Sequence, residues 1–291
     1  MIRAVTIVGV AGEFGRRFAE RFAAMGLSVT GVDISPRPLA GDLLDHYIHC
    51  DAATANWHDL GAEEPHRLVL LCLPQQAVLS ALPRLMPALA PDAIAADIVS
   101  VKSHIAHEFS RHNTTGQYVS LHPMFGPAME WTGQRVASIA LRDGPAVEHL
   151  EGMLDHWGMQ ITRMTADEHD RGAAVTQVMT HATLLALGSA LQQSEVPPPV
   201  RDALTTPPYR VLQAMIARLT SGDPSLYRHI QHDNPHASDA RALLADQFRT
   251  LAQACESEEA FADLMRRASP ANRDQLAALS AKLAEISRER S

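Results

Sequence analysis

The stretch that decides the fold is AVTIVGVAGEFG, residues 4–15. Its first five residues are apolar or β-branched and predict a buried strand. A helical pattern then begins near Glu13 and ends at Gly26, a residue suited to a left-handed helix cap. The glycine-rich turn between them allows close backbone approach, so amide groups at the start of the helix can hold a phosphate. This order of strand, turn and helix predicts a dinucleotide site.

The glycines of this turn follow the spacing GxxGxxG, with Val10 where the common GxGxxG pattern has a glycine. Asp33 closes the next apolar run 18 residues after Gly15, where a carboxylate can hydrogen-bond ribose hydroxyls. The alternative is a turn aspartate before Ile34-Ser35-Pro36. We expect the ribose role. Because a carboxylate repels a 2′-phosphate, NAD is expected rather than NADP, although Arg37 could cover a phosphate instead.

Residues 1–164 alternate short apolar runs with helical patterns, which is typical of a parallel sheet covered by helices on both faces. From Thr165 onward only helical patterns occur. We therefore predict an α/β protein in which a Rossmann-type, doubly wound, dinucleotide-binding domain (1–164) precedes an all-helical domain (165–291). The further strands are expected at Ser28–Val32, Arg67–Leu73, Ala93–Ile98, Tyr118–Leu121, Arg135–Leu141 and Met159–Arg163.

The helical half carries clear boundary signals. Thr165-Ala166-Asp167-Glu168 is a capping-box sequence and opens a helix that reaches about Gln193. The proline run at residues 197–199 breaks the chain. Further helices are expected at Pro207–Thr220 and Pro270–Arg288, with a turn at Asp223-Pro224 between them.

Composition argues against several classes of protein. A net charge of −8 disfavours nucleic acid and anionic membranes as partners, because both attract a basic surface. Three cysteines without close spacing suggest neither disulfides nor a metal site. The N-terminus lacks the pattern of a secretion signal, and the longest apolar stretch of the second half, Ala182–Leu191, is too short to span a bilayer. We expect a cytoplasmic protein that binds no metal.

A second motif, SLHPMFGP at residues 120–127, places His122 at the end of an apolar run. Pro123 restrains the residue before it to an extended backbone, and ligands of open α/β sheets bind beyond the carboxyl ends of the strands. An imidazole titrates near neutrality and suits general-base work. From spacing alone, a structural histidine that merely closes the strand is an equal alternative.

Together with DIVSVK at residues 97–102 and EHD at residues 168–170, in this order over nearly the whole chain, the HPMFGP motif resembles the prephenate dehydrogenase family. The resemblance implies an NAD-dependent oxidoreductase of aromatic amino acid biosynthesis, on the route to tyrosine. In that family the histidine polarises the ring hydroxyl of a cyclohexadiene, hydride passes to NAD, and loss of the ring carboxylate makes the product aromatic. The expected reaction converts prephenate to 4-hydroxyphenylpyruvate, with His122 as the catalytic residue.

The resemblance also assigns roles around the histidine. Ser100 would be the second catalytic residue, hydrogen-bonded to His122 or to the substrate hydroxyl. Without the resemblance it is equally a cap for a helix that begins near Ser103. Lys102 is interpreted as a solvated surface lysine, with a place near the cofactor or substrate as the alternative. The cofactor is expected to contact Gly9, Gly12, Phe14, Gly15, Asp33, Leu73 and Pro74.

The helical half is expected to hold the substrate, a dicarboxylate. Gln177 and His181 lie four residues apart on one helix face, and the resemblance assigns His181 to substrate contact. Guanidinium groups suit planar carboxylates. In the family an arginine five residues before an Asp-Pro pair holds the side-chain carboxylate, and Arg218 matches that position. Arg210, about two helical turns earlier, is expected to help on the same face.

The loop after HPMFGP does not decide which member of the substrate class is bound. The chain has Ala128-Met129-Glu130-Trp131 there, where family members more often have small polar residues. Arogenate and 4-amino-4-deoxyprephenate, each carrying an amine, are therefore alternatives to prephenate. Glu130 is a candidate partner for such an ammonium group, and a solvent-facing glutamate is the alternative.

Two rival functions are considered, one another dehydrogenase and one from a different class, a sensor without catalysis. A β-hydroxyacid dehydrogenase would use a lysine on the long interdomain helix, but no lysine occurs between Lys102 and Lys282. A non-catalytic NAD-binding sensor would not need catalytic and substrate-binding residues together. In the family the helical domain forms a homodimer, and the apolar helices at Ala182–Leu191 and Pro270–Arg288 are candidates for that interface.

Overall fold

The computed structural model describes residues 1–36 and 43–269 and divides into two compact units. The first unit is Met1–Gly172 and the second begins at Ala173. The helix that starts at Ala166 runs across this division. The assignment of residues 1–164 and 165–291 as functional domains therefore stays a prediction, and each unit is described by itself.

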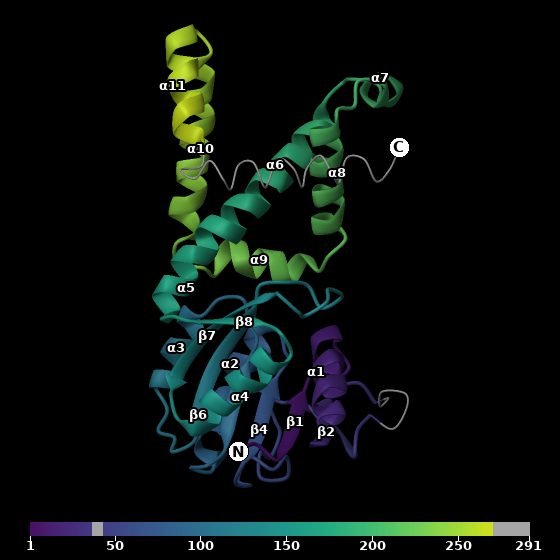
Figure 1. Ribbon diagram of the computed structural model, residues 1–291, viewed down its shortest axis with the longest axis vertical. Helices are drawn as coiled ribbons and strands as arrows, with labels where there is room; N and C mark the ends of the chain where they lie inside the picture. Colours follow the sequence, from purple (N-terminus) through teal and green to yellow (C-terminus); the bar gives the residue numbers. More distant parts are fainter. Residues whose placement is uncertain (37–42, 270–291) are drawn as a thin grey trace. The chain divides into compact units, whose positions relative to one another are not determined.

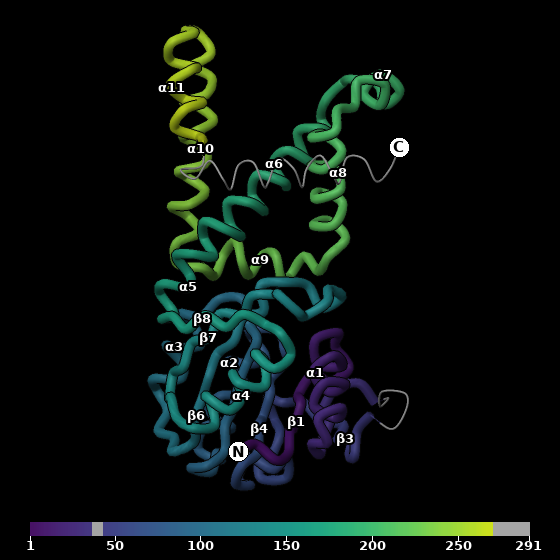
Figure 2. The backbone as a smooth tube through the Cα atoms, viewed as in Figure 1, coloured from purple at the N-terminus to yellow at the C-terminus, as the bar shows by residue number. Residues whose placement is uncertain are grey.

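The first unit is built on one eight-stranded sheet, shown in Figure 1. The strand order β3-β2-β1-β4-β5-β6-β7-β8 grows outward in both directions from β1, as in a doubly wound fold. Strand β3, labelled at the edge in Figure 2, escapes the sequence pattern because none of its four residues is fully buried. The strands are β1 (Ala4–Val8), β2 (Ser28–Asp33), β3 (His46–His49), β4 (Arg67–Leu71), β5 (Ile94–Asp97), β6 (Gln117–Pro123), β7 (Arg135–Arg142) and β8 (Gln160–Arg163).

Strands β1 to β6 pair in parallel, as predicted, whereas β6 and β7 are antiparallel. The predicted parallel sheet is confirmed for these strands and for the β7–β8 pair, and the β6–β7 pairing is the antiparallel addition. A parallel neighbour needs a crossover, usually a helix, and no helix lies between Pro123 and Arg135. The chain turns back at the edge where β6 ends. His122 consequently lies inside a paired strand, opposite Ala137.

Helices cover both faces of this sheet (Figure 1). Phe22 of α1 and Leu150 of α4 belong to one buried apolar cluster, and Leu82 of α2 and Ile105 of α3 belong to a second. The two clusters lie on opposite faces, so the predicted doubly wound architecture is confirmed. The helices are α1 (Glu13–Ala24), α2 (Gln75–Ala88), α3 (Ser103–Ser110) and α4 (Pro145–His156).

The long helix predicted to begin at Thr165 starts with its capping box formed. Glu168 Oε2 accepts the Thr165 amide at 2.8 Å, and the Thr165 hydroxyl accepts the Glu168 amide at 3.2 Å. The helix is not regular throughout, because α5 (Ala166–Ala173) passes into a π-helical segment, η1 (Ala174–Val178), before α6 (Met179–Gln193). Such segments occur frequently at functional sites.

The second unit is helical, as predicted. Helix α6 packs against α8 and α10, and α10 also packs against α9 and α11. The proline run at residues 197–199 starts a short helix, α7, rather than only breaking the chain. The predicted helix at Pro270–Arg288 lies outside the described residues. The helices are α7 (Pro198–Ala203), α8 (Pro207–Thr220), α9 (Pro224–His232), α10 (Ala237–Ala254) and α11 (Glu258–Ala268).

The continuous helical run Ala166–Gln193 is long and apolar enough to cross a membrane, by length and composition alone. The expectation that the apolar segment is too short to span a bilayer considered only Ala182–Leu191. The helix that contains this segment is longer, because it also includes the π segment and α5. Only 17% of the apolar window in this run is buried, so within one chain it is not a buried core helix. Here α6 packs against two other helices, α8 and α10.

Candidate active site

The glycine-rich turn is shaped by steric needs at two of its glycines. Gly9 has a φ of +84°, and a Cβ there would lie 2.3 Å from the carbonyl oxygen of Cys72. A Cβ at Gly15 would lie 2.1 Å from the carbonyl oxygen of Gly9. Both positions therefore require glycine, so that the turn can pass tightly between β1, the end of β4 and α1.

The unusual spacing of the turn has a packing reason. Val10 is fully buried, and its Cγ1 lies 2.8 Å from where a Cβ would stand on Gly31 of β2. The valine side chain thus fills the core, and Gly31 provides the space for it. Gly12 is the N-cap of α1 and offers no side-chain cap. The amides of the first helical turn remain suitable for an anion such as a pyrophosphate.

Asp33 stands beside this turn at the end of β2. Its Oδ2 accepts the Ala11 amide at 2.9 Å, and its Oδ1 accepts the Ser35 amide at 2.9 Å. The carboxylate is partly exposed and fixed on the turn by these two bonds. The arrangement fits a group that recognises ribose hydroxyls close to the phosphate cradle.

The other predicted cofactor residues lie at different depths. Leu73 and Pro74 follow β4, and Leu73 Cδ2 is 3.0 Å from a Cβ built on Gly9, so both flank the turn. Phe14 is half-buried, and its ring meets Phe125 edge to face, with 6.0 Å between ring centroids. The Phe14 ring therefore joins the start of α1 to the HPMFGP loop.

His122 lies at the carboxyl end of β6 and is 5% exposed. Its Nδ1 is 2.8 Å from Nε2 of His169 on α5. Burial lowers the pKa of His122 well below its ordinary value, and the neighbouring Lys102 and His169 lower it further. The imidazole is therefore neutral at physiological pH and able to accept a proton.

The glycine turn and His122 lie along the same edge of the sheet. The carboxyl ends of parallel strands point to one edge, and β1, β4, β5 and β6 are neighbours in that order. At the usual strand spacing, three steps across the sheet separate the end of β1 from the end of β6 by about 14 Å. An extended dinucleotide held at the glycine turn fits along such an edge.

Lys102 is fully buried, which contradicts the interpretation as a solvated surface lysine. Its Nζ donates to Ser120 Oγ at 2.8 Å and to the Leu121 carbonyl at 2.6 Å, and lies 3.5 Å from Asp97 Oδ1. Asp97 also accepts the Tyr118 hydroxyl at 2.9 Å. The ion pair of Lys102 and Asp97 is thus buried and hydrogen-bonded next to His122 in β6. Burying either charge without the other would reduce the stability of the fold.

Ser100 lies at the turn that leaves β5 and is half-buried. Within the described residues no hydrogen bond links it to His122, whose Nδ1 faces His169 instead. The alternative role as a cap of α3 is wrong. The N-cap is Lys102, and the carboxylate of Asp170 accepts the amides of Lys102 and Ser103, each at 2.9 Å.

The loop after HPMFGP is anchored by Trp131, a residue that sequence reasoning did not single out. Its indole is fully buried against Phe18, with ring centroids 4.8 Å apart, and Arg21 lies over it at 5.1 Å. Arg17 of α1 also donates to the Met129 carbonyl at 3.4 Å. Glu130, between the two anchored residues, is exposed.

Gln177 and His181 of the second unit each have a buried polar atom, Oε1 and Nδ1 respectively, without a hydrogen-bond partner among the described residues. Gln177 belongs to the π segment, so simple four-residue spacing does not describe this face. The His181 ring meets Tyr227 of α9 edge to face at 5.1 Å. Burial lowers the pKa of His181, and a neutral imidazole is favoured there.

Arg210 and Arg218 both lie on α8 and are exposed. Neither guanidinium makes a hydrogen bond or ion pair to another described residue, so both are available to an anion. Asp223 caps α9 by accepting the Ser225 amide at 2.9 Å, which confirms the expected turn at Asp223-Pro224.

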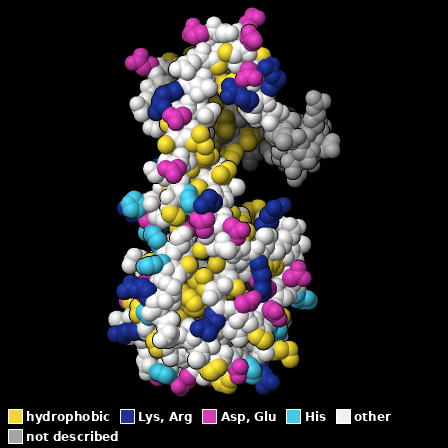
Figure 3. All heavy atoms as spheres, turned by 90° about the vertical axis from the view of Figure 1, so that its left-hand side faces the viewer, with side chains coloured by type: hydrophobic (Ala, Val, Ile, Leu, Met, Phe, Trp, Pro, Cys, Tyr) yellow, Lys and Arg dark blue, Asp and Glu magenta, His cyan; other side chains and the backbone are white. Residues whose placement is uncertain are grey.

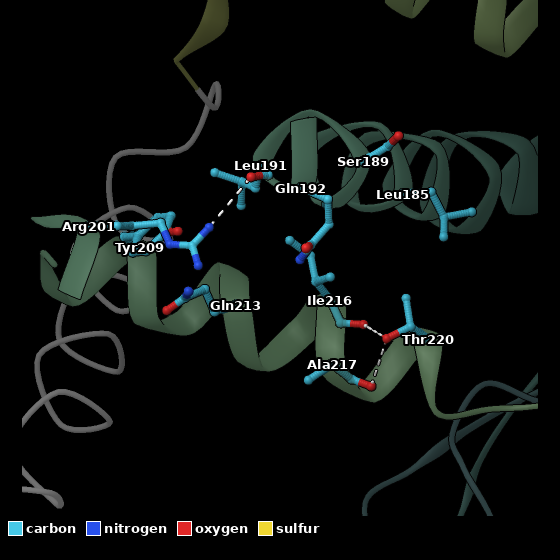
Figure 4. Close-up of a pocket in the computed structure, with 11 residues that line it drawn as sticks. Leu185, Ser189, Leu191, Gln192, Arg201, Tyr209, Gln213, Ile216, Ala217 and Thr220 are labelled. Carbon is cyan, nitrogen blue, oxygen red and sulfur yellow. Dashed lines mark hydrogen bonds between the residues drawn. The ribbon is translucent and has the colours of Figure 1, made fainter. Parts of the chain in front are cut away.

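A cavity of about 560 Å³ lies elsewhere in the second unit, between α6, α7 and α8 (Figure 4). Arg201, which lines it, donates to the Leu191 carbonyl at 3.5 Å. None of the predicted substrate residues lines this cavity, so we do not place the substrate there. Its lining includes Leu185, Ser189, Gln192, Tyr209, Gln213 and Ile216.

Comparison with known proteins identifies both halves of the chain. Residues 21–142 match the nucleotide-binding domain of prephenate dehydrogenase, and residues 165–267 match its dimerization domain. The helical run Ala166–Gln193 thus lies almost at the start of the dimerization domain. The predicted resemblance to this family is confirmed.

Two relatives are similar at about one third identity. The chain is 33% identical over 260 residues to 4-amino-4-deoxyprephenate dehydrogenase of Streptomyces pristinaespiralis, which covers 89% of this chain and 87% of the relative. It is 31% identical over 233 residues to the T-protein of Enterobacter agglomerans, covering 79% of this chain. The match spans only 56% of the T-protein.

The fold also has solved counterparts. Prephenate dehydrogenase of Aquifex aeolicus in complex with hydroxyphenyl propionate and NAD+ superposes with a TM-score of 0.71, at 20% identity, over 98% of this chain and 99% of that one. The predicted cofactor, NAD, is thus the one bound in a structure of the same fold. On its two domain matches and its full-length relative, the chain belongs to the prephenate dehydrogenase family and is a dehydrogenase with that family's nucleotide-binding and dimerization domains.

Proposed function

We propose that this protein catalyses the NAD-dependent oxidative decarboxylation of a prephenate-like cyclohexadiene. Prephenate, which would give 4-hydroxyphenylpyruvate in aromatic amino acid biosynthesis, is the first candidate substrate. The observation that carries the proposal is the buried, neutral imidazole of His122 on the sheet edge that also carries the glycine turn. A base in that place serves proton removal next to a bound dinucleotide.

The proposed chemistry needs one proton acceptor from the chain. Bound NAD+ supplies the acceptor for the ring hydride, and departure of the ring carboxylate as CO₂ makes the product aromatic. His122 would accept the hydroxyl proton through Nε2, because its Nδ1 is taken by His169. The proton would return to the ring oxygen when loss of CO₂ makes the ring aromatic. Ser100, half-buried at the end of β5, is proposed to orient the same hydroxyl.

The helical residues are proposed to hold the substrate's carboxylates. Arg218 is the proposed clamp for the side-chain carboxylate, with Arg210 on the same helix in support, since both guanidinium groups are exposed and unengaged among the described residues. His181 and Gln177 are proposed substrate contacts, because each keeps an unsatisfied buried polar atom.

A second candidate substrate is 4-amino-4-deoxyprephenate. It is favoured by the Streptomyces pristinaespiralis relative, which this chain matches over 87% of the relative's length. Glu130 is the proposed partner of the ring ammonium group, because it is exposed on a loop fixed on both sides by Trp131 and Met129. Arogenate, which carries its amine on the side chain, is the third substrate to test.

Initial rates with prephenate, arogenate and 4-amino-4-deoxyprephenate decide among these candidates. Each is measured by absorbance of NADH, in the wild type and in Glu130→Gln. If Glu130 recognises an amine, the variant should lose up to roughly fivefold in kcat/KM for that amine substrate, since an exposed ion pair contributes up to about 1 kcal/mol. Prephenate should be unaffected. Equal, small effects on all three would remove Glu130 from recognition, and no NADH with any of them would favour a non-catalytic NAD-binding sensor.

Cofactor choice gives a second prediction. We expect the wild type to prefer NAD over NADP, because the Asp33 carboxylate repels a 2′-phosphate near the Ala11 amide. Asp33→Ser should lower the ratio of kcat/KM with NAD to kcat/KM with NADP by roughly tenfold, which corresponds to about 1.4 kcal/mol. The control is Glu20→Ser, which removes a carboxylate of α1 that pairs with Arg16 on the same helix. A wild type that prefers NADP would contradict the role of Asp33.

The dimerization-domain match supports a homodimer formed through the helical unit. Large apolar side chains are exposed there, and Figure 3 shows hydrophobic side chains on the surface of its helices. The free thiols of all three cysteines fit a reducing compartment, so we propose a cytoplasmic location. The exposed large apolar side chains of α10 and α11 are Leu243, Phe248, Leu251, Phe261 and Met265.

A further inference from the structure

Three buried side chains of the first unit form a line that ends at His122. His122 Nδ1 lies 2.8 Å from His169 Nε2, and His169 Nδ1 lies 2.8 Å from Asp170 Oδ1. The exposed fractions of the three residues are 5%, 3% and 0%. No solvent therefore competes for these contacts, and the protons between them must be arranged consistently.

The direction of the line is set at its carboxylate end. Asp170 accepts the backbone amides of Lys102 and Ser103 and the Ser103 hydroxyl. Burial by itself would raise the pKa of Asp170, but the hydrogen bonds from His169, from the Ser103 hydroxyl and from the two amides outweigh it and hold the pKa below its usual value. An ionised carboxylate only accepts hydrogen bonds, so it requires His169 to donate through Nδ1.

When His169 carries a single N–H, the remaining assignments follow. With its proton on Nδ1, His169 presents Nε2 as an acceptor, and His122 must donate to it from its own Nδ1. The second nitrogen of His122, Nε2, is then left without a proton. The Asp170 carboxylate, acting through His169, thus selects which nitrogen of His122 is basic.

We propose that His169 and Asp170 are positioning residues that hold His122 as its Nδ1–H tautomer and leave Nε2 as the base. The proposal rests on the proposed function of His122, although the tautomer can be measured without any substrate. The charged and titratable groups around His122 are His169 and Asp170 from α5, and Lys102 with its partner Asp97 behind β6.

The tautomer is read by imidazole ¹⁵N NMR on full-length protein labelled at histidine, with His122→Asn used to assign the signals. We expect a protonated Nδ1 and an unprotonated Nε2 for His122 near neutral pH. A protonated Nε2 in the wild type would overturn the proposal. If no cyclohexadiene were turned over, the proposed function would fail, while this spectrum would still decide the role of His169 and Asp170.

Kinetics then distinguish positioning from a merely structural role. His169→Phe should lower kcat by roughly 10²-fold with little change in KM, since a wrong catalytic tautomer costs up to about 10⁴-fold in a Ser-His-Asp triad. His169→Gln, whose amide oxygen can accept the Nδ1–H of His122, should recover most of that loss. His112→Phe is the matched control, because it makes the same change at a part-buried histidine that pairs with Glu108 instead, and it should leave kcat unchanged. A folded His169→Phe enzyme with full kcat and the Nδ1–H tautomer would also refute the proposal.

Discussion

Replacing His122 with asparagine should lower kcat by roughly 10²- to 10⁴-fold, the range over which general-base catalysis contributes. Asparagine keeps a polar group of similar reach toward His169 but cannot accept the substrate proton at neutral pH. The loss should appear as slower NADH formation with the best of the three substrates. Because the side chain is buried within β6, the melting temperature must be measured beside the rate, and a full-speed variant would remove His122 from the mechanism.

The pH profile of the wild type should show the same base. A general base works only when unprotonated, and burial together with Lys102 and His169 holds the pKa of His122 well below its ordinary value. The rate, as kcat/KM, should therefore stay level as the pH falls through about 6.5, where an unperturbed histidine titrates, and decline only at lower pH. A decline centred on 6.5 would contradict this environment for His122.

Replacing Lys102 with methionine should reduce the free energy of unfolding by roughly 3–5 kcal/mol, the usual cost of breaking a buried ion pair at one partner. The variant leaves Asp97 buried without its cation, and Ser120 and the Leu121 carbonyl lose a donor. Urea titration measures the loss. A change within about 0.5 kcal/mol, as at an exposed position, would contradict the buried location.

A double-mutant cycle isolates the charge from the packing. Asp97→Asn keeps an acceptor for the Tyr118 hydroxyl while removing the negative charge. The double variant Lys102→Met with Asp97→Asn should therefore be less destabilised than the sum of the single variants, by about 1 kcal/mol or more. Strict additivity would show that the two charges do not interact.

Local sequence patterns predict most of the elements that position the site. The apolar run of β1, the glycine turn, the capping box at Thr165 and the proline start of α8 each depend on neighbours within a few residues. Such signals survive in a single sequence because backbone conformation and helix ends respond to nearby side chains. The family motifs added the catalytic role of His122, which the apolar run before Pro123 already places at the end of a strand.

The contacts that surround His122 could not be predicted from the sequence, because they join residues that are far apart along the chain. A lysine is usually found at the surface, so the sequence alone does not indicate that Lys102 is buried. Its buried partner, Asp97, is in place only because β5 pairs with β6 and sets Asp97 opposite Ser120. His169 and Asp170 belong to a recognisable EHD motif, but their contact with His122 spans 47 residues of sequence. The antiparallel turn at β7 and the π segment around Gln177 likewise depend on tertiary constraints.

The burial of Lys102 makes the chain an unusual target for amine chemistry. Its sequence contains 23 arginines but only two lysines, Lys102 and Lys282. An acylating reagent added to the native enzyme finds Lys102 sealed behind β6, and can reach it only when the centre of the sheet opens. The rate at which the peptide containing Lys102 is acylated, measured by mass spectrometry, would therefore report how often the centre of the sheet opens. Lys102 should not react while the sheet is closed.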